Sequence, residues 1–452
     1  MIPCAKQLPF VLCGLSFLES ALTNIQFQNL TLIASAIILG AKFNLTEITY
    51  MWLRGKSISA LSEFLSDAKV STYEMQQLYL LHIHNKYKIR RGYFIVDDTM
   101  KHHTKFCKWI HGVSVIFDHA LGTNLKATCI VFLYYSDGDR RKCFIDFRIF
   151  YKENTRMPWC KGKKYVHKKK YDLAIDMIRN AMDKGFPGCI VLADSWYGIE
   201  PFIKQLRHLR LSYILEIGTK NKVRINSETP KLTQTGKMAK KQYELKSFAD
   251  YFVRILTCEI CGFAADKETD RKEKVIYHVK IATVRLNSIS GKHRLIESVD
   301  PTKKTTKYFI TDQLTWEASK IICVYHYRWV IEEFFRNAKQ LTDMEGATIR
   351  SEQGITITLY LVSWIDFLLH YENYKLSIAG ELTKESLTIP SIVRRLQYEN
   401  QLAFLDKVRN DEEYVTKWLK ITQENICRKR KKSKELILLG DSNTQGEELL
   451  AA

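Results

Sequence analysis

Two short apolar segments of this chain each run directly into an aspartate. Residues 93–96 form a continuous apolar run that stops at Asp97 and Asp98, and residues 188–193 stop at Asp194. Runs without polar alternation are typical of central strands that are buried on both faces. We therefore expect two central strands of an α/β sheet, each with a carboxylate at its end. Asp is also favoured in turns, so either site alone has a purely local explanation.

The segments around these runs complete the α/β pattern. Residues 129–135 and 143–151 are strand-like and flank an Asp-Gly-Asp turn, and residues 171–184 have helical spacing. This order predicts a hairpin-connected set of strands and then a helical crossover that brings residues 188–193 beside the first strand. Another strand is expected over residues 211–217.

A third carboxylate lies on a predicted helix. Helical spacing extends from about residue 315 to 340. Four polar residues of this helix share about 60° of arc at 100° per residue: Tyr325, Arg328, Glu332 and Lys339. One face of the helix thus carries a carboxylate, two cations and a phenol. The alternative is an ordinary solvated face with a four-residue ion pair.

The spacing Tyr-x2-Arg-x3-Glu-x6-Lys on this helix resembles the defining motif of a family of proteins. Together with two strand-end aspartates in the correct order, it is similar to bacterial insertion-sequence transposases of the Asp-Asp-Glu (DDE) type. The resemblance covers about residues 90–372 and extends to an Asp-x-Thr pattern at Asp97 and an Asp-Ser-Trp-Tyr-Gly segment that begins at Asp194. It implies an α/β fold with a ribonuclease-H-like mixed-sheet core and an inserted mainly β region, preceded and followed by helical segments.

The resemblance also implies the catalytic residues. Asp97, Asp194 and Glu332 would catalyse the reaction and hold two Mg²⁺ ions, with Mn²⁺ as a substitute. Carboxylates are the hard oxygen ligands that these ions prefer. Asp98 is the alternative for the first position, although the Asp-x-Thr pattern selects Asp97.

The same resemblance implies the DNA contacts and the partners. Tyr325, Arg328 and Lys339 would bind phosphates of the transposon end. The expected partners are the inverted-repeat ends, the target DNA and a second copy of the chain in the DNA complex. The implied function is cleavage at transposon ends and strand transfer into target DNA by a cut-and-paste route. A degenerate or repurposed relative that binds DNA without cutting it is the alternative.

The resemblance and the residue patterns divide the chain into five regions. They are a helical N-terminal module with a DNA-end-binding role (1–90), the first part of the catalytic core (91–219), the inserted mainly β region (220–305), the second part of the core (306–372) and a basic helical tail (373–452).

Charge and cysteine usage agree with a DNA-binding protein of the bacterial cytoplasm. Lys and Arg total 69 against 49 Asp and Glu, a net charge of +20, which favours a polyanionic partner. The 11 Cys are scattered through apolar runs, as in reducing compartments. No membrane association is expected, and we expect the protein on the nucleoid. Residues 161–170 are strongly basic, and their interpretation is divided between a solvated run and a path for DNA phosphates.

Overall fold

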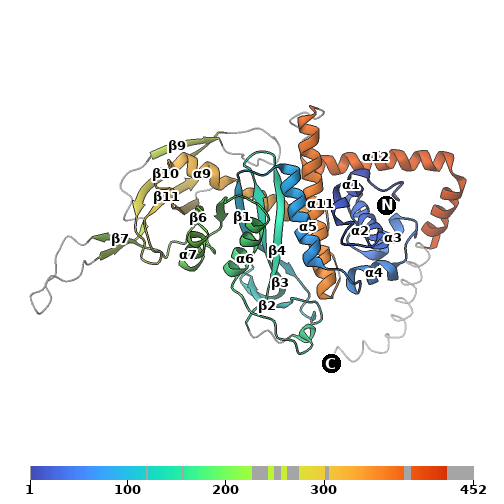
Figure 1. The fold of residues 1–452 in the computed structure, drawn as a ribbon, viewed down its shortest axis with the longest axis horizontal. Coiled ribbons are helices and arrows are strands. Elements are labelled where there is room, and N and C mark those ends of the chain that lie inside the picture. The colour runs from blue at the N-terminus through green and yellow to red at the C-terminus, as the bar shows by residue number, and fades with distance from the viewer. Residues whose placement is uncertain are drawn as a thin grey trace, which may run out of the picture.

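The centre of the protein is a ten-stranded mixed sheet flanked by helices (Figure 1). The computed structural model describes residues 2–118, 121–153, 157–226, 243–248, 256–261, 274–300, 305–347, 349–380 and 388–424. The described strands are β1 (Tyr93–His102), β2 (Ser114–Asp118), β3 (Thr123–Ser136), β4 (Lys142–Phe150), β5 (Ile190–Ala193), β6 (Tyr213–Glu216), β7 (Val223–Asn226), β8 (Tyr243–Lys246), β9 (Leu256–Cys261), β10 (Lys274–Val284), β11 (His293–Asp300) and β12 (Thr305–Thr311).

The pairing of the strands confirms the α/β prediction. β3 is antiparallel to β1 and to β4, and β5 is parallel to both β1 and β6. The order β4-β3-β1-β5-β6 is therefore a hairpin set, followed by a crossover through helix α6 (Lys170–Asp183). This mixed sheet has the ribonuclease-H-like arrangement that the resemblance implied.

The described parts of the inserted region are mainly strands. β12 pairs antiparallel with β6, and β11, β10 and β9 extend the same sheet beyond it. β7 and β8 form a separate two-stranded sheet.

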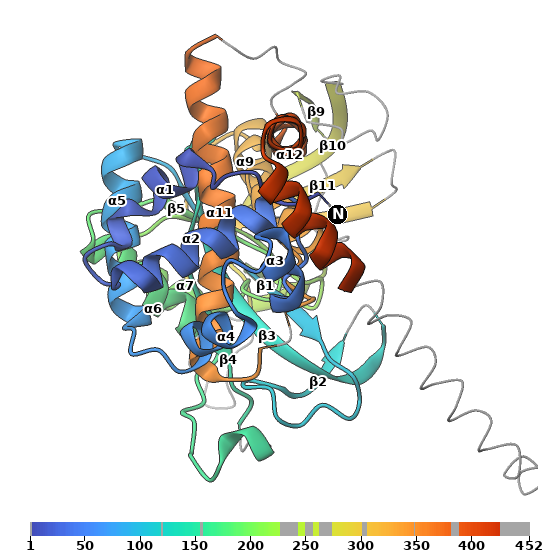
Figure 2. The same cartoon turned by 90° about the vertical axis from the view of Figure 1, so that its right-hand side faces the viewer.

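Helices from both ends of the chain surround one long central helix, α11 (Glu352–Ile378) (Figure 2). The other described helices are α1 (Pro9–Leu15), η1 (Ser16–Leu18), α2 (Asn24–Ile38), α3 (Leu45–Met51), α4 (Ile58–Ser66), α5 (Thr72–Tyr87), η2 (Pro158–Cys160), α7 (Glu200–His208), α9 (Ala318–His326), α10 (Trp329–Gln340) and α12 (Ile389–Asn410). Polar N-caps explain several of the starts, for example Thr23, whose side chain forms a capping box with Gln26.

A single hydrophobic core joins the helices to the sheet. It extends from Val11 of α1 through the strands to Val393 of α12. α11 has the length and hydropathy of a membrane span, but most of it is buried inside the protein, as in the core helix of a globular fold. Residues 412–424 are also helical, and the basic cluster at 428–432 lies outside the described residues.

Two local predictions were wrong. The first strand does not stop at Asp97 but continues to His102, because β3 pairs with β1 along its whole length, from Ser136 to Ala127. The predicted helix over about 315–340 is interrupted between α9 and α10.

Candidate active site

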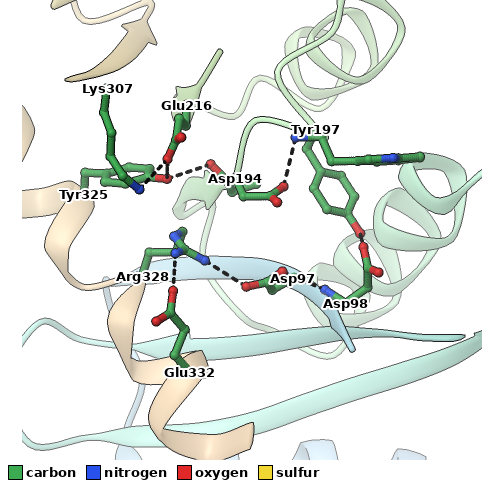
Figure 3. Close-up of polar contacts among 11 residues, drawn as sticks. Asp97, Asp98, Asp194, Tyr197, Glu216, Lys307, Tyr325, Arg328 and Glu332 are labelled. Atoms are coloured by element: carbon green, nitrogen blue, oxygen red, sulfur yellow. Dashed lines mark hydrogen bonds and ion pairs between the residues drawn. The ribbon is translucent and has the colours of Figure 1, made fainter. Parts of the chain in front are cut away.

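The register of the parallel strands brings two of the predicted carboxylates together. Val96 of β1 pairs with Ala193 of β5, so Asp97 and Asp194 follow at the same level on neighbouring strands (Figure 3). β5 ends there, and the Asp194 Oδ1 atom accepts a hydrogen bond of 3.1 Å from the backbone N–H of Trp196. This bond fixes the turn that follows the strand. The carboxyl ends of parallel strands are where open α/β sheets place their functional groups.

Asp97 and Asp98 face different surroundings because consecutive strand residues point to opposite faces of a sheet. The Asp97 Oδ2 atom accepts a bond of 2.8 Å from Nη1 of Arg328. Asp98 instead accepts a bond of 2.7 Å from Nζ of Lys170, at the start of α6, and a bond of 3.4 Å from the Tyr197 hydroxyl. Of the two candidates, Asp97 therefore lies on the side of Arg328, whereas Asp98 already has a cationic partner elsewhere.

The helix interruption places Arg328 between two carboxylates. At the break, backbone N–H groups bond three residues back rather than four, as in Arg328 N to Tyr325 O at 2.9 Å and Ile331 N to Arg328 O at 3.2 Å. This tight turn ends α9 and starts α10, and it directs the guanidinium toward β1. The Nη2 atom of Arg328 bonds to Glu332 Oε1, while its Nη1 atom bonds to Asp97. The structure thus joins the first and third predicted carboxylates through one cation.

Burial and the negative charge of neighbouring carboxylates raise the pKa of the two strand-end carboxyls. Burial raises the pKa of Asp97 to about 7, although the positive charge of Arg328 acts in the opposite direction. Burial also raises the pKa of Asp194, and the negative charge of Asp98 adds to the effect. Carboxyls that resist ionisation beside one another are characteristic of sites that bind an added cation.

The donor chemistry at this position fits a hard divalent cation. The ligand atoms of Asp97, Asp194 and Glu332 are all carboxylate oxygens. Arg328 already forms ion pairs with two of these carboxylates, those of Asp97 and Glu332. As the side chains stand, no three Asp, Glu, His or Cys residues in the described part of the chain are close enough together to hold a metal ion. A metal would therefore have to take over the position between the carboxylates that the guanidinium now holds.

Tyr325 lies beside this position but is buried. Its side chain is 7% exposed, and its hydroxyl donates to Glu216 Oε2 at 3.1 Å and lies 3.4 Å from the carbonyl oxygen of Ala193. Its ring packs on Phe309 of β12 at 4.4 Å between centroids. Tyr325 thus connects α9 to the ends of both β5 and β6.

Glu216 is a neighbour that the sequence analysis missed. Ala193 pairs with Leu215, so Asp194 and Glu216 also follow at the same level on adjacent strands. Glu216 accepts a bond of 3.0 Å from Nζ of Lys307, which leaves it paired outside the Arg328 cluster. Residues 211–217 were expected to form a strand, and its terminal Glu was the available signal.

Lys339, the last residue of the motif, lies apart from the carboxylates. Its Nζ atom forms an ion pair of 2.9 Å with Glu345, and both side chains are partly exposed. Lys339 lies on α10 with Glu332 but seven residues further along, about 10 Å at the helix rise, and the break before α10 separates Tyr325 from both of them. Of the seven predicted site residues, the structure links Asp97, Arg328 and Glu332 directly and places Asp194 and Tyr325 beside them.

Comparison with known families agrees with this geometry. Residues 29–251 match the family described as DDE superfamily endonuclease, and residues 167–365 match the family described as transposase DDE domain. No curated protein matches the chain. The enzymes of this superfamily are generally dependent on divalent metal ions. The two matches overlap and together contain every predicted site residue, and they support a DDE-type transposase.

Proposed function

We propose that this chain is an active transposase that cleaves DNA at the ends of its element and joins those ends to target DNA. The observation that carries the proposal is that Arg328 bonds to both Asp97 of β1 and Glu332 of α10, while Asp194 follows at the level of Asp97 on the neighbouring strand β5. In this proposal Asp97, Asp194 and Glu332 hold two Mg²⁺ ions. When bound, such ions activate the attacking oxygen and stabilise the leaving oxygen of a phosphodiester.

Arg328 would act in two states. Without DNA it neutralises Asp97 and Glu332, which are otherwise close and mostly shielded from solvent. With DNA, the same planar fork would bind a phosphate next to the cleaved one, since a guanidinium matches phosphate oxygens in a bidentate manner. The carboxylates would then be free for metal. Lys339 would bind a more distant phosphate in exchange for Glu345.

For Tyr325 we propose a positioning role in place of the expected phosphate contact. Its hydroxyl is already bonded to Glu216 and lies against the Ala193 carbonyl, one residue before Asp194. This pair of contacts holds the end of β5 against α9. The phenol would therefore keep the Asp194 carboxylate in place without touching DNA.

The remaining parts of the proposal concern assembly and location. Helices α1–α5 would bind the inverted-repeat end, and two copies of the chain would act together, each on one end. The net charge of +20 suits a protein that resides on bacterial nucleoid DNA. The subgroup defined by the Tyr-Arg-Glu-Lys spacing is also part of the proposal, because all four of its residues are present in order.

Incubation with a plasmid tests the function. Purified full-length protein and Mg²⁺ are added to supercoiled DNA that carries the element's own ends, and a second plasmid carries scrambled ends. Cutting only at the native ends supports the transposase. End binding without any cutting, in Mg²⁺ or Mn²⁺, would instead favour a repurposed DNA-binding relative.

A further inference from the structure

Two loops at one end of the sheet form a small unit with a core of its own. One loop follows β1 and the other follows β4, and both lie at the lower end of the molecule near β2 (Figure 1). Their buried apolar residues are Val113, Trp159 and Cys160, and they form a cluster separate from the main core. Nε1 of Trp159 donates a bond of 2.8 Å to the Val113 carbonyl, and the His111 ring contacts the indole at 4.7 Å between centroids. The two loops are thus held together as one unit.

Two aromatic side chains project from this unit into solvent. Phe106 is 77% exposed and Trp109 is 58% exposed. Lys105 and Lys108 lie beside them in the chain, and Nζ of Lys105 is 5.2 Å from the centre of the Phe106 ring. Large apolar side chains gathered at an exposed site mark a surface that binds another molecule.

The second loop adds positive charge to the same unit. Its basic segment contains Lys161, Lys163 and Lys164, none of which forms an ion pair with a residue in the described ranges, whereas Lys168 pairs with Asp176 at 2.6 Å. Glu352 also borders the unit, where it accepts a bond of 3.4 Å from the Tyr165 hydroxyl. The excess of unpaired lysines indicates an anionic partner.

We infer that this unit, named here the aromatic-basic loops, binds unpaired nucleotides of single-stranded DNA. The inference rests on the proposed function, which supplies DNA as the partner. Exposed rings stack on unpaired bases of any sequence, and the flanking lysines bind the phosphates between them. Duplex DNA keeps its bases stacked inside the helix and would leave both rings without a partner. Lysines alone would accept either form, so the rings favour the single strand.

The aromatic-basic loops are distinct from the candidate active site. β1 ends at His102, five residues beyond Asp97. At the rise of a strand, these two residues are about 16 Å apart. That length separates the start of the loops from the candidate metal ligand along the sheet. The loops would therefore hold a strand several nucleotides from the cleaved phosphate.

Fluorescence anisotropy tests the inference on the full-length protein without divalent metal, so that no DNA is cut. The probes are a labelled oligothymidine of about 16 nucleotides, the upper site size of a single-strand binding fold, and a duplex of the same length. Phe106→Ala combined with Trp109→Ala should weaken binding of the single strand by about tenfold or more, since each stacked base contributes about 1–3 kcal/mol. Binding of the duplex should change by less than about twofold.

Three further variants make the test specific. Phe106→Tyr with Trp109→Phe retains two rings and should restore single-strand binding. Tyr398→Ala removes a ring that is 60% exposed on α12, away from these loops, and should have no effect. Lys105→Gln with Lys108→Gln should lower the slope of log affinity against log salt by about 1.4, at about 0.7 per phosphate.

Unchanged single-strand affinity in the double alanine variant would overturn the inference, as would an equal loss for the duplex. Both results are independent of cleavage. If the wild-type protein cuts its native ends but the rings do not affect single-strand binding, the inference fails while the proposed function stands. If the protein never cuts but single-strand binding depends on the rings, the proposed function fails while the inference stands.

Discussion

Replacement of Tyr325 by Phe separates a positioning role from a DNA contact. The change removes the hydroxyl and keeps the ring on Phe309. The lost hydrogen bond to Glu216 has a charged acceptor, and such bonds contribute about 1.5–3 kcal/mol. Glu216 retains Lys307 at 3.0 Å, which lowers the expected loss of unfolding free energy to about 1–2 kcal/mol.

For a chain of 452 residues, that loss corresponds to a decrease in Tm of about 1–2 °C, at about 1 °C per kcal/mol. Calorimetry or a thermal unfolding curve measures it directly. Single-turnover cleavage should decrease, because the end of β5 that carries Asp194 is held less firmly. The affinity for end DNA and its dependence on salt should stay as in the wild type, because the buried hydroxyl of Tyr325 does not contact a phosphate.

Tyr327→Phe is the matched control on the same segment. Its ring stacks on Tyr93 at 5.0 Å, and the change should alter stability by less than about 0.5 kcal/mol. An unchanged Tm in Tyr325→Phe together with weaker end binding would refute the positioning role. In that case the hydroxyl would have to leave Glu216 and bind DNA.

Three other predictions follow from charged groups. Lys339→Ala should lower the slope of log affinity against log salt for end DNA by about 0.9. Glu345→Gln should strengthen end binding, because it frees Lys339 from its ion pair. If neither variant changed the affinity for end DNA, the proposed phosphate contact of Lys339 would be contradicted. Arg328→Lys should reduce single-turnover cleavage by tenfold or more, because an ammonium cannot bind a phosphate in the bidentate manner proposed for the guanidinium in the DNA complex, and full activity would contradict that role. Burial raises the pKa of Asp366 to about 7, above its ordinary value, so the stability that this carboxyl contributes is complete near pH 4 and is lost as the pH rises through 7. Asp366→Asn should remove this pH-dependent loss of unfolding free energy, which totals about 4 kcal/mol. The prediction would be contradicted if the unfolding free energies of the two proteins changed by the same amount between pH 4 and pH 8.

Much of the sheet could be predicted because its central strands have a strong local signal. The runs that became β1 and β5 are apolar without interruption, and the helical pattern between them requires a parallel return. The same signal could not show that β1 continues past Asp97, since its polar second half is held by pairing with β3 rather than by burial. β2 was missed for the same reason: it lies at the edge and pairs only with the end of β3.

The candidate site was predictable in composition but not in arrangement. Spacing along a helix did not reveal the break before α10, and the partner of Arg328, Asp97, lies far away in the sequence. Similarly, the buried state of Tyr325 depends on Glu216, which only the register of β5 and β6 brings near. Contacts between side chains on different helices and strands are set by the tertiary fold, and they cannot be inferred from the local pattern of a single sequence.

The most direct test of the central claim is a comparison of cleavage in Mg²⁺ and in Mn²⁺ by cysteine variants of the two adjacent aspartates. Thiolate is a poor ligand for Mg²⁺ and a better one for the softer Mn²⁺. If Asp97 binds the metal, Asp97→Cys should be inactive on end DNA in Mg²⁺ and regain measurable cleavage in Mn²⁺. Asp98→Cys, which loses the contacts with Lys170, Tyr197 and Cys129, should show no such metal-dependent rescue. Rescue of Asp98→Cys but not of Asp97→Cys would contradict the assignment and move the first metal ligand to the opposite face of β1.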